Sequence, residues 1–155
     1  MKLVVQRVSR ASVKVDGEVV GAIEQGMLIL LGVLVGDGER EMQKLAEKVA
    51  RFRFFQDEQG RMNLSAMDLG LEVLLVSQFT LAADGRRGRR PSFDQAADPE
   101  VARKLYEQFA QKLRELGLVC ATGRFGAMME VELVNQGPAT FVLEEAPPGA
   151  PNGSP

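Results

Sequence analysis

The run GMLILLGVLV, residues 26–35, decides the fold class, because every one of its ten residues is glycine or apolar. Its glycine borders and β-branched residues are typical of a strand that is buried on both faces. A second run, LEVLLVSQFT at residues 71–80, has the same character but ends in polar residues. The two runs predict two central strands of a buried sheet.

An amphipathic helix is expected to follow each central strand. After residues 36–38 (GDG), apolar side chains recur at spacings of three and four while charged residues take the other positions. The next helix has clear ends, with Asp98 as N-cap, Pro99 at its first position and Gly117 after its last turn. The apolar stripes comprise Met42, Leu45, Val49 and Phe52 in the first helix, and Val101, Leu105, Phe109, Leu113 and Leu116 in the second.

Alternation and turn residues predict the remaining strands. Asp16-Gly17 separates two short apolar runs, and this pair favours a hairpin with a type I′ turn. The order is a strand and hairpin, then strand-helix twice, then strands, which indicates one mixed α/β domain over residues 1–145. The Pro-, Gly- and Ser-rich residues 146–155 are expected to be a disordered tail. Further strands are predicted at residues 2–8, 11–15, 18–23, 129–134 and 139–143, with turns at 56–60 and 135–138.

The composition excludes several kinds of chemistry. Histidine is absent, so there is no Ser-His-Asp triad, no histidine-activated cysteine and no histidine-ligated metal. The single Cys120 agrees with a reducing compartment. The sequence shows neither a long apolar run nor the features of a signal peptide. We therefore expect a cytoplasmic protein without a membrane span. A net charge of -2 does not suggest a protein that coats nucleic acid.

Three segments carry groups that suit binding or catalysis. Residues 77–80 (SQFT), the pocket segment, offer two hydroxyls, an amide and backbone N–H groups at a strand end, although polar residues also simply close strands. Residues 135–138 (NQGP), the Gly-Pro segment, permit unusual backbone geometry, although an ordinary turn explains them as well. Residues 85–91, the arginine loop, carry Arg86, Arg87, Arg89 and Arg90, which suit RNA phosphates or a solvated loop.

Taken together, these residues resemble the D-aminoacyl-tRNA deacylase family. The likeness covers residues 1–145 in the family's order, and seven motifs in sequence are specific where one would be weak. The motifs are Gln6-Arg7-Val8 with Ala11-Ser12-Val13, then residues 26–33, Met62-Asn63-Leu64, Ser77–Leu81, Arg90–Phe93, Thr122–Ala127 and Asn135–Phe141.

The resemblance implies a single three-layer α/β/β domain with mixed sheets and two main helices. It implies a homodimer with active sites at the subunit interface, and neither a cofactor nor a metal. The pocket would be built around Ser77, Gln78, Phe79 and Thr80. Gly137-Pro138, with a cis peptide bond, would enter the partner's pocket, Arg7 would orient that turn and Met129 would line the pocket.

The implied reaction is hydrolysis of the ester that joins a D-amino acid to the 3′-terminal adenosine of tRNA. Because this ester is reactive, orientation and oxyanion stabilisation by N–H groups near Phe79 and Thr80 suffice without a histidine base. The neighbouring 2′-OH would assist. Carbonyl groups of Gly137 and Pro138 would exclude an L side chain, whereas glycyl-tRNA, including glycine mischarged on tRNA-Ala, would be accepted.

Two alternatives remain at this point. A related deacylase uses the Gly-Pro turn in trans and clears L-alanyl-tRNA. A non-catalytic tRNA-binding module would bind charged and uncharged tRNA alike, although the acidic pI and the lack of an interleaved basic and aromatic surface weigh against it.

Overall fold

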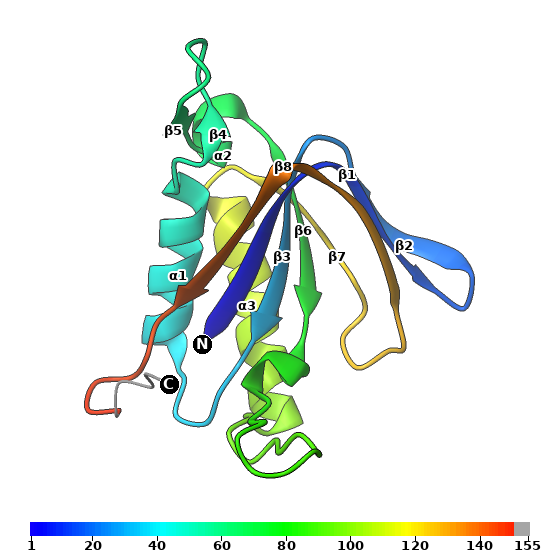
Figure 1. Ribbon diagram of the computed structural model, residues 1–155, viewed down its shortest axis with the longest axis vertical. Coiled ribbons are helices and arrows are strands. Elements are labelled where there is room, and N and C mark those ends of the chain that lie inside the picture. The colour runs from blue at the N-terminus through cyan, green and yellow to red at the C-terminus, as the bar shows by residue number, and fades with distance from the viewer. Residues whose placement is uncertain (151–155) are drawn as a thin grey trace.

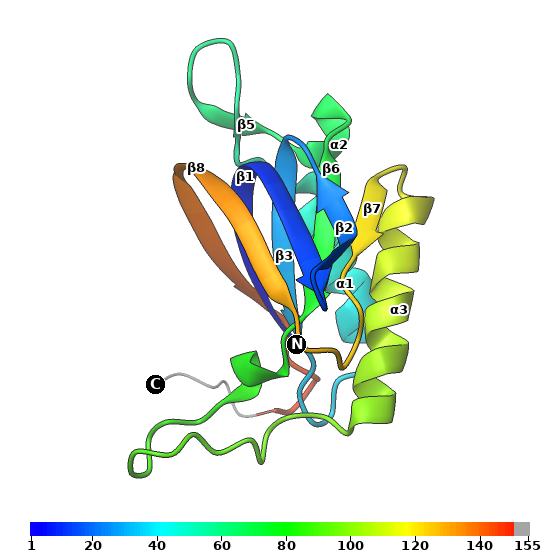
Figure 2. The ribbon, with the colours of Figure 1, turned by 90° about the vertical axis from the view of Figure 1, so that its right-hand side faces the viewer.

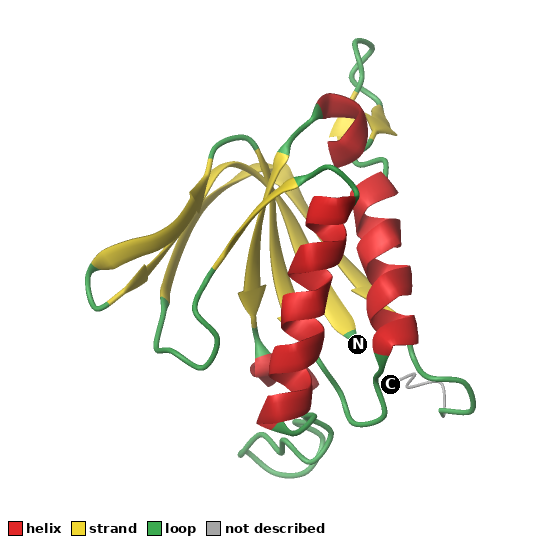
Figure 3. Cartoon of the chain, turned by 180° about the vertical axis from the view of Figure 1, so that it is seen from behind, coloured by secondary structure: helices red, strands yellow, loops and turns green. Residues whose placement is uncertain are grey.

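The chain forms one strongly curved, six-stranded sheet with two long helices against one face (Figures 1 and 3). The computed structural model describes residues 1–150. The strands follow the order β2-β1-β3-β6-β7, and β8 pairs with the other side of β1. The sheet strands are β1 (Lys2–Val15), β2 (Glu18–Ile23), β3 (Gly26–Gly32), β6 (Glu72–Ser77), β7 (Val119–Thr122) and β8 (Glu130–Glu144).

The two apolar runs form the parallel centre of the sheet, as predicted. β3 and β6 lie side by side with Leu31 opposite Ser77, while β1 runs antiparallel to β3. All residues of β3 except Leu30 are buried, as are the four central residues of β6, Val73–Val76. β3 ends at Gly32, three residues before the predicted end at Val35, because Leu34 bridges to Ala96 and Val35 turns outward with 61% of its surface exposed.

The second central strand is shorter than predicted. β6 ends at Ser77, and residues Phe79–Ala82 form the 3-10 helix η1, so Thr80 does not belong to a strand. The neighbouring strand β3 has ended by this point, which leaves no ladder partner beyond Ser77. The Gln78 N–H donates to the Leu31 carbonyl at 2.8 Å, and Leu81 packs over Gly32, where a Cβ would lie 2.8 Å from the Leu81 Cβ.

β1 and β8 are each one long strand, where the sequence predicted two. The Gly-Pro segment lies within β8 and does not reverse the chain, so the predicted turn between two strands is wrong. β8 follows β1 from Glu130 to Glu144, and two shifts of register interrupt the pairing between Gln6 and Arg10. β8 can accommodate extra residues as a local bulge because it has a partner strand, β1, on one side only.

The hairpin folds over the far face of the central strands (Figure 2). Asp16 and Gly17 have φ angles of 50° and 80°, which confirms the predicted turn. β2 then crosses β7 so closely that a Cβ on Gly21 would clash with the Thr122 carbonyl oxygen. Side chains between these two parts of the sheet form a second core: Val8, Ala11, Val13, Ile23, Leu28, Leu74 and Val76.

The main core lies between the sheet and helices α1 (Glu39–Arg51) and α3 (Pro99–Glu115). The predicted stripe of α1 is buried up to Val49 and half-buried at Phe52. In α3 the buried stripe begins at Leu105, because Val101 in the first turn is 45% exposed, contrary to prediction. Asp98 is the N-cap residue, although its side chain makes no capping hydrogen bond.

Short elements escaped the sequence analysis. The hairpin of β4 (Phe55–Gln56) and β5 (Met62–Leu64), the one-turn helix α2 (Ala66–Leu69) and β7 carry too few residues for a recognisable period. Ser65 caps α2 by accepting from the Asp68 N–H at 3.1 Å. The hairpin and α2 lie at the end of the sheet where α1 finishes.

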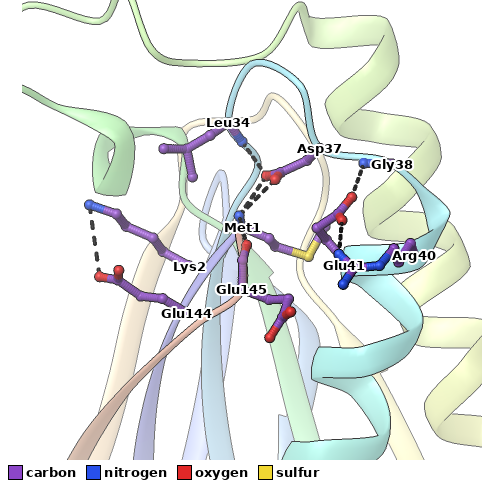
Figure 4. Close-up of polar contacts among 9 residues, drawn as sticks. All are labelled: Met1, Lys2, Leu34, Asp37, Gly38, Arg40, Glu41, Glu144 and Glu145. Atoms are coloured by element: carbon purple, nitrogen blue, oxygen red, sulfur yellow. Dashed lines mark hydrogen bonds and ion pairs between the residues drawn. The ribbon is translucent and has the colours of Figure 1, made fainter. Parts of the chain in front are cut away.

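Buried polar contacts tie the two long strands to the loop before α1 (Figure 4). The α-ammonium of Met1 donates to the Asp37 carboxylate and to the Glu145 carbonyl, both at 2.8 Å, and the Leu34 N–H donates to Asp37 at 2.7 Å. Beyond β8, the Ala150 N–H donates to the Pro147 carbonyl at 3.1 Å. The rest of the expected tail, residues 151–155, lies outside the described residues. No helix within residues 1–150 has the length and apolar character to cross a membrane.

Candidate active site

The pocket segment lies where β6 ends and η1 begins. Ser77 and Gln78 are half-buried, whereas Thr80 is exposed and its hydroxyl oxygen accepts a hydrogen bond from the Gln78 amide. The N–H groups of Phe79 and Thr80 begin η1 and have no acceptor among residues 1–150. Two adjacent free donors of this kind suit an anionic oxygen.

An exposed aromatic pair borders the pocket segment. The ring of Phe79 is 58% exposed and lies 5.1 Å, centroid to centroid, from the ring of Phe93. Phe93 follows the arginine loop, whose ends are joined by two hydrogen bonds of 2.8 Å between Asp84 and Ser92. The aromatic pair therefore fixes the base of the arginine loop beside the pocket segment. The sequence analysis gave no role to Phe93 beyond its place in a motif.

Met129 lies close to the pocket segment in space. Its sulfur accepts a hydrogen bond from the Arg124 N–H at 3.4 Å and lies 2.7 Å from the place a Cβ on Gly123 would take. That same place is 3.7 Å from a methyl group of Val76, the residue before Ser77. Met129 therefore stands beside the end of β6, and Gly123 makes room for it.

The Gly-Pro segment projects from β8 as an exposed bulge. Residues 136–138 are exposed, and neither Gly137 nor Pro138 has a partner residue in the pairing of β8 with β1. Arg7, only 7% exposed, holds the base of the bulge: its Nε donates to the Gln136 carbonyl at 2.9 Å and its Nη1 donates to the Phe54 carbonyl at 2.8 Å.

Asn135 holds the other side of the bulge. Its Oδ1 accepts from the Ala139 N–H at 2.7 Å, and its Nδ2 donates to the Thr140 hydroxyl at 2.9 Å. Gly137 has a φ of 138°, and a Cβ there would lie 2.7 Å from Nη2 of Arg7. The peptide bond between Gly137 and Pro138 is cis. The sequence motif contained Asn135, but its clamping role depends on contacts that only the fold reveals.

Within one chain the Gly-Pro segment and the pocket segment are far apart. Arg7 is opposite Met27, which in turn is opposite Val73, four residues before Ser77 along β6. Four residues of strand correspond to about 13 Å. The two segments therefore lie level with opposite ends of β6, and the structure does not bring them together within one chain.

The arginine loop contains one internally paired arginine and three others. Arg86 donates to both oxygens of Asp84, at 3.0 and 2.8 Å, and this contact lowers the pKa of Asp84 to about 2. Arg87, Arg89 and Arg90 are exposed and make no ion pair within residues 1–150. Arg86 thus shapes the loop, and the other three are the residues that remain for anionic partners.

No strong acid or base belongs to the pocket segment, whose side chains are a hydroxyl, an amide, a phenyl ring and a second hydroxyl. Cys120 is buried in β7, and burial raises the pKa of its thiol to about 11, so it is not a nucleophile. No group of three carboxylate or thiol side chains in residues 1–150 is placed to hold a metal. What the site offers to a reaction is hydrogen-bond donors and a surface that can position a substrate.

The chain as a whole matches a known class of proteins. Residues 4–144 match the family described as D-Tyr-tRNA(Tyr) deacylase. A D-aminoacyl-tRNA deacylase of Roseiflexus sp. (strain RS-1) is 62% identical over 146 residues, 94% of each chain. One of Koribacter versatilis (strain Ellin345) is 59% identical over 144 residues, which cover 93% of this chain and 97% of the relative.

Solved structures agree with this match. A protein described as c-Myc DNA Unwinding Element Binding Protein superposes with a TM-score of 0.90 at 41% identity, over 95% of this chain and all of the other. A probable eukaryotic D-amino acid tRNA deacylase shares the fold, with a TM-score of 0.77 at 15% identity over 92% of this chain and 98% of the other.

The chain belongs to the D-Tyr-tRNA(Tyr) deacylase family. It is therefore a hydrolase of the ester bond in aminoacyl-tRNA, as the resemblance predicted.

Proposed function

We propose that this protein hydrolyses D-aminoacyl-tRNA, and glycyl-tRNA mischarged on tRNA-Ala, in the cytoplasm, and that the Gly-Pro segment of a second copy makes it reject L-aminoacyl-tRNA. One observation carries the proposal. The Gly-Pro segment and the pocket segment each have exposed residues, at 136–138 and at 79–80, but they lie level with opposite ends of β6. A second copy would supply to each pocket the segment that its own chain holds elsewhere.

The surface around the Gly-Pro segment supports such a homodimer. β8 pairs only with β1 among the described strands, which leaves its outer edge free. Val131, Val134 and Val142 on this strand are exposed, on both sides of the Gly-Pro segment. Unpaired edges and exposed apolar side chains are features that proteins usually cover, and a two-fold contact uses the same strand from both copies.

Catalysis in this proposal depends on position and on the free N–H groups. Water attacks the ester carbonyl, and the oxygen of the tetrahedral intermediate accepts from the N–H groups of Phe79 and Thr80. The bond to the ribose 3′-oxygen then breaks, that oxygen takes up a proton, and the amino acid leaves as a carboxylic acid. The 2′-OH of the terminal adenosine orients the attacking water, because the pocket segment has no base of its own.

Thr80 is a poor nucleophile in this arrangement. Its hydroxyl oxygen already accepts a hydrogen bond from Gln78, and no histidine exists in the chain to remove its proton. Attack by water with assistance from the substrate needs neither a free Thr80 hydroxyl nor a histidine base.

Chirality is selected by exclusion. Carbonyl groups of Gly137 and Pro138 from the partner would occupy the space that an L side chain requires, while a D side chain would point to solvent. A steric clash discriminates more sharply than a missing contact. Glycine has no side chain to clash, so glycyl-tRNA is a substrate in this account. The clamps on the bulge, Arg7 and Asn135, keep these carbonyls in place.

A mixing experiment tests whether the site is shared between copies. Pro138→Ala removes the ring that fixes the backbone φ, so this chain alone is expected to cleave L-tyrosyl-tRNA in addition to the D-ester. Thr80→Arg fills the exposed entrance of the pocket and leaves no turnover. Excess Thr80→Arg chain is then exchanged into Pro138→Ala dimers. In each mixed dimer the working pocket belongs to the Pro138→Ala chain, and the Thr80→Arg chain supplies it with an intact Gly-Pro segment. The ratio of L-ester to D-ester cleavage should therefore return to that of the wild type.

A ratio that stays at the value of the Pro138→Ala protein would place both segments in one chain and contradict the shared site. L-alanyl-tRNA belongs in the same series, because efficient cleavage of that ester with D-esters spared would favour the alternative deacylase. Binding of tRNA without cleavage of any ester would favour the non-catalytic module.

A further inference from the structure

A surface groove of about 620 Å³ follows the C-terminal half of α1. Lys44, Glu47, Lys48, Arg51, Phe52 and Arg53 line it, so four of its six residues are cationic. None of these residues belongs to the pocket segment, the Gly-Pro segment or the arginine loop. We refer to these six residues as the basic groove.

Ion pairs within the molecule leave the basic groove with free positive charge. Glu47 is paired with Lys112 at 3.4 Å, and Lys44 is paired with Glu145 at 3.5 Å. Lys48 and Arg51 are exposed, and within residues 1–150 neither lies within 4.0 Å of a carboxylate. The one acid of the groove is thus neutralised from outside it, while at least two cations are not.

Arg53 adds a third charge at the end of the groove. Its guanidinium donates to the side chain and to the carbonyl of Asn63, the latter at 2.7 Å, and both acceptors are neutral. The Asp68 carboxylate attracts Arg53 without forming an ion pair with it, so the charge of Arg53 is only partly compensated. Basic residues in the last turn of a helix complement the helix dipole, which accounts for Lys48 and Arg51 in part. Arg53 lies beyond the end of α1, where the dipole gives no reason for it.

Two sets of contacts place the basic groove near the Gly-Pro segment, although no groove residue touches that segment directly. Phe54, next to Arg53, offers its carbonyl to Nη1 of Arg7, whose Nε holds the Gln136 carbonyl. The ring of Phe52 packs edge-on against Phe141 of β8, with centroids 5.4 Å apart. A substrate that meets the Gly-Pro segment therefore lies beside the groove of that same chain.

We propose that the basic groove of one chain binds backbone phosphates in the acceptor stem of the tRNA whose 3′ end occupies the partner's pocket. This inference rests on the proposed function, because it takes the Gly-Pro segment to enter the partner's pocket. Lys48, Arg51 and Arg53 contact phosphates, and the arginine loop of the other chain holds the same tRNA near its 3′ end. Each copy thus supplies to its partner's pocket both the Gly-Pro segment, which excludes L side chains, and the basic groove, which binds phosphates.

The test uses the full-length dimer with Lys48→Gln/Arg51→Gln. The matched control is Arg10→Gln/Lys14→Gln, which removes the same two charges from exposed positions of β1 outside the groove. Affinity for uncharged tRNA is measured by filter binding between 50 and 200 mM salt. Turnover is measured on D-tyrosyl-tRNA and on D-tyrosyl-adenosine, which has the ester but no stem.

For the groove variant we expect about a tenfold loss of tRNA affinity at low salt, and a salt slope smaller by about one for each phosphate contact removed. We expect a similar loss in kcat/KM on D-tyrosyl-tRNA and no change on D-tyrosyl-adenosine. The control should match the wild type. Equal losses in the groove variant and the control, no loss in either, or an equal fall on both esters would overturn the proposal.

Chain mixing separates the groove from the proposed reaction. Excess Thr80→Arg chain, with its intact groove, should restore the kcat/KM of each working pocket in the groove variant, and a failure to do so would overturn the assignment to the partner. If the wild type cleaves no ester while the groove variant alone still loses tRNA affinity, the reaction is wrong and phosphate binding by the groove stands.

Discussion

The guanidinium of Arg7 connects the Gly-Pro segment to the end of α1, with Nε 2.9 Å from the Gln136 carbonyl and Nη1 2.8 Å from the Phe54 carbonyl. One buried side chain thus satisfies two backbone acceptors from parts of the chain that are far apart in sequence. It also occupies the space beside Gly137. In the proposed mechanism, the position of the Gly-Pro segment therefore depends on Arg7.

Replacing Arg7 should weaken discrimination more than catalysis. Arg7→Lys keeps the charge, but a single ammonium on a flexible stem cannot reproduce the fork that binds both carbonyls. We expect L-tyrosyl-tRNA cleavage to rise at least tenfold relative to D-tyrosyl-tRNA, with stability lowered by about 1–3 kcal/mol for the carbonyl left without a donor. Initial rates on both esters and thermal unfolding measure this. An unchanged L-to-D ratio would deny Arg7 its positioning role.

Gly137→Ala tests the close approach of Arg7 to the bulge. The new methyl group would lie 2.7 Å from Nη2 of Arg7, and a φ of 138° is unfavourable for alanine. We expect a loss of about 1–3 kcal/mol and impaired discrimination. Gly60→Ala is the control, since Gly60 also has a positive φ, of 78°, but its Cβ would meet nothing. If Gly137→Ala and Gly60→Ala lowered stability equally and neither changed the L-to-D ratio, the effect at Gly137 would be backbone strain alone, and the close approach of Arg7 would have no role.

Thr80→Ala distinguishes assistance by the substrate from nucleophilic attack by the protein. If the 2′-OH orients water, we expect D-tyrosyl-tRNA turnover to fall by no more than about tenfold, because the N–H groups of residues 79 and 80 remain. A substrate ending in 2′-deoxyadenosine should lose far more. Complete loss of turnover in Thr80→Ala, with tRNA binding intact, would identify the Thr80 hydroxyl as the nucleophile.

The buried Cys120 gives a prediction on pH. Burial raises the pKa of its thiol to about 11, whereas an unfolded thiol titrates near about 8.5. The folded state therefore favours the protonated thiol: this stability is complete below the unfolded pKa and is lost as pH rises toward 11. Wild-type stability should fall more steeply than that of Cys120→Ala between pH 8.5 and 11. Parallel curves would contradict this burial effect.

Reactivity toward a small alkylating agent provides a second readout for Cys120. At pH 8, the native thiol should react at least about a hundredfold more slowly than in urea, because both access and the thiolate fraction are reduced. Comparable rates in the two conditions would show that the thiol is neither buried nor shifted.

The sequence predicted the parts of the fold that have a strong local period. β3, β6, α1 and α3 were found from their apolar patterns, and Asp16-Gly17 identified its hairpin. The end of β6 was misplaced because it depends on the neighbouring strand. β3 stops at Gly32, and no residue near Ser77 indicates that the partner strand ends there. Val101 was wrongly assigned to the buried stripe, because helical periodicity does not show which turns of a helix the rest of the chain covers.

The candidate site was predicted residue by residue but not in its relationships. Ser77–Thr80 and Gly137-Pro138 were singled out from the sequence, yet their separation across the sheet appears only through the pairing of β1, β3 and β6. Arg86 resembled its three neighbours in the sequence, whereas in the structure it is bound to Asp84. Phe93 had no local feature that marks a contact with Phe79. The separation of the two segments and the contact of Phe93 with Phe79 depend on residues far apart in sequence, whereas Arg86 and Asp84 are only two residues apart.

The most direct measurement compares deacylation of D-tyrosyl-tRNA, L-tyrosyl-tRNA and glycyl-tRNA at one enzyme concentration. The account predicts rapid loss of the D-tyrosyl and glycyl esters while the L-tyrosyl ester remains at its spontaneous rate of hydrolysis. Cleavage of the L-tyrosyl ester at a rate comparable to the D-ester would contradict exclusion by the Gly-Pro segment, and survival of all three esters would contradict the proposed reaction itself.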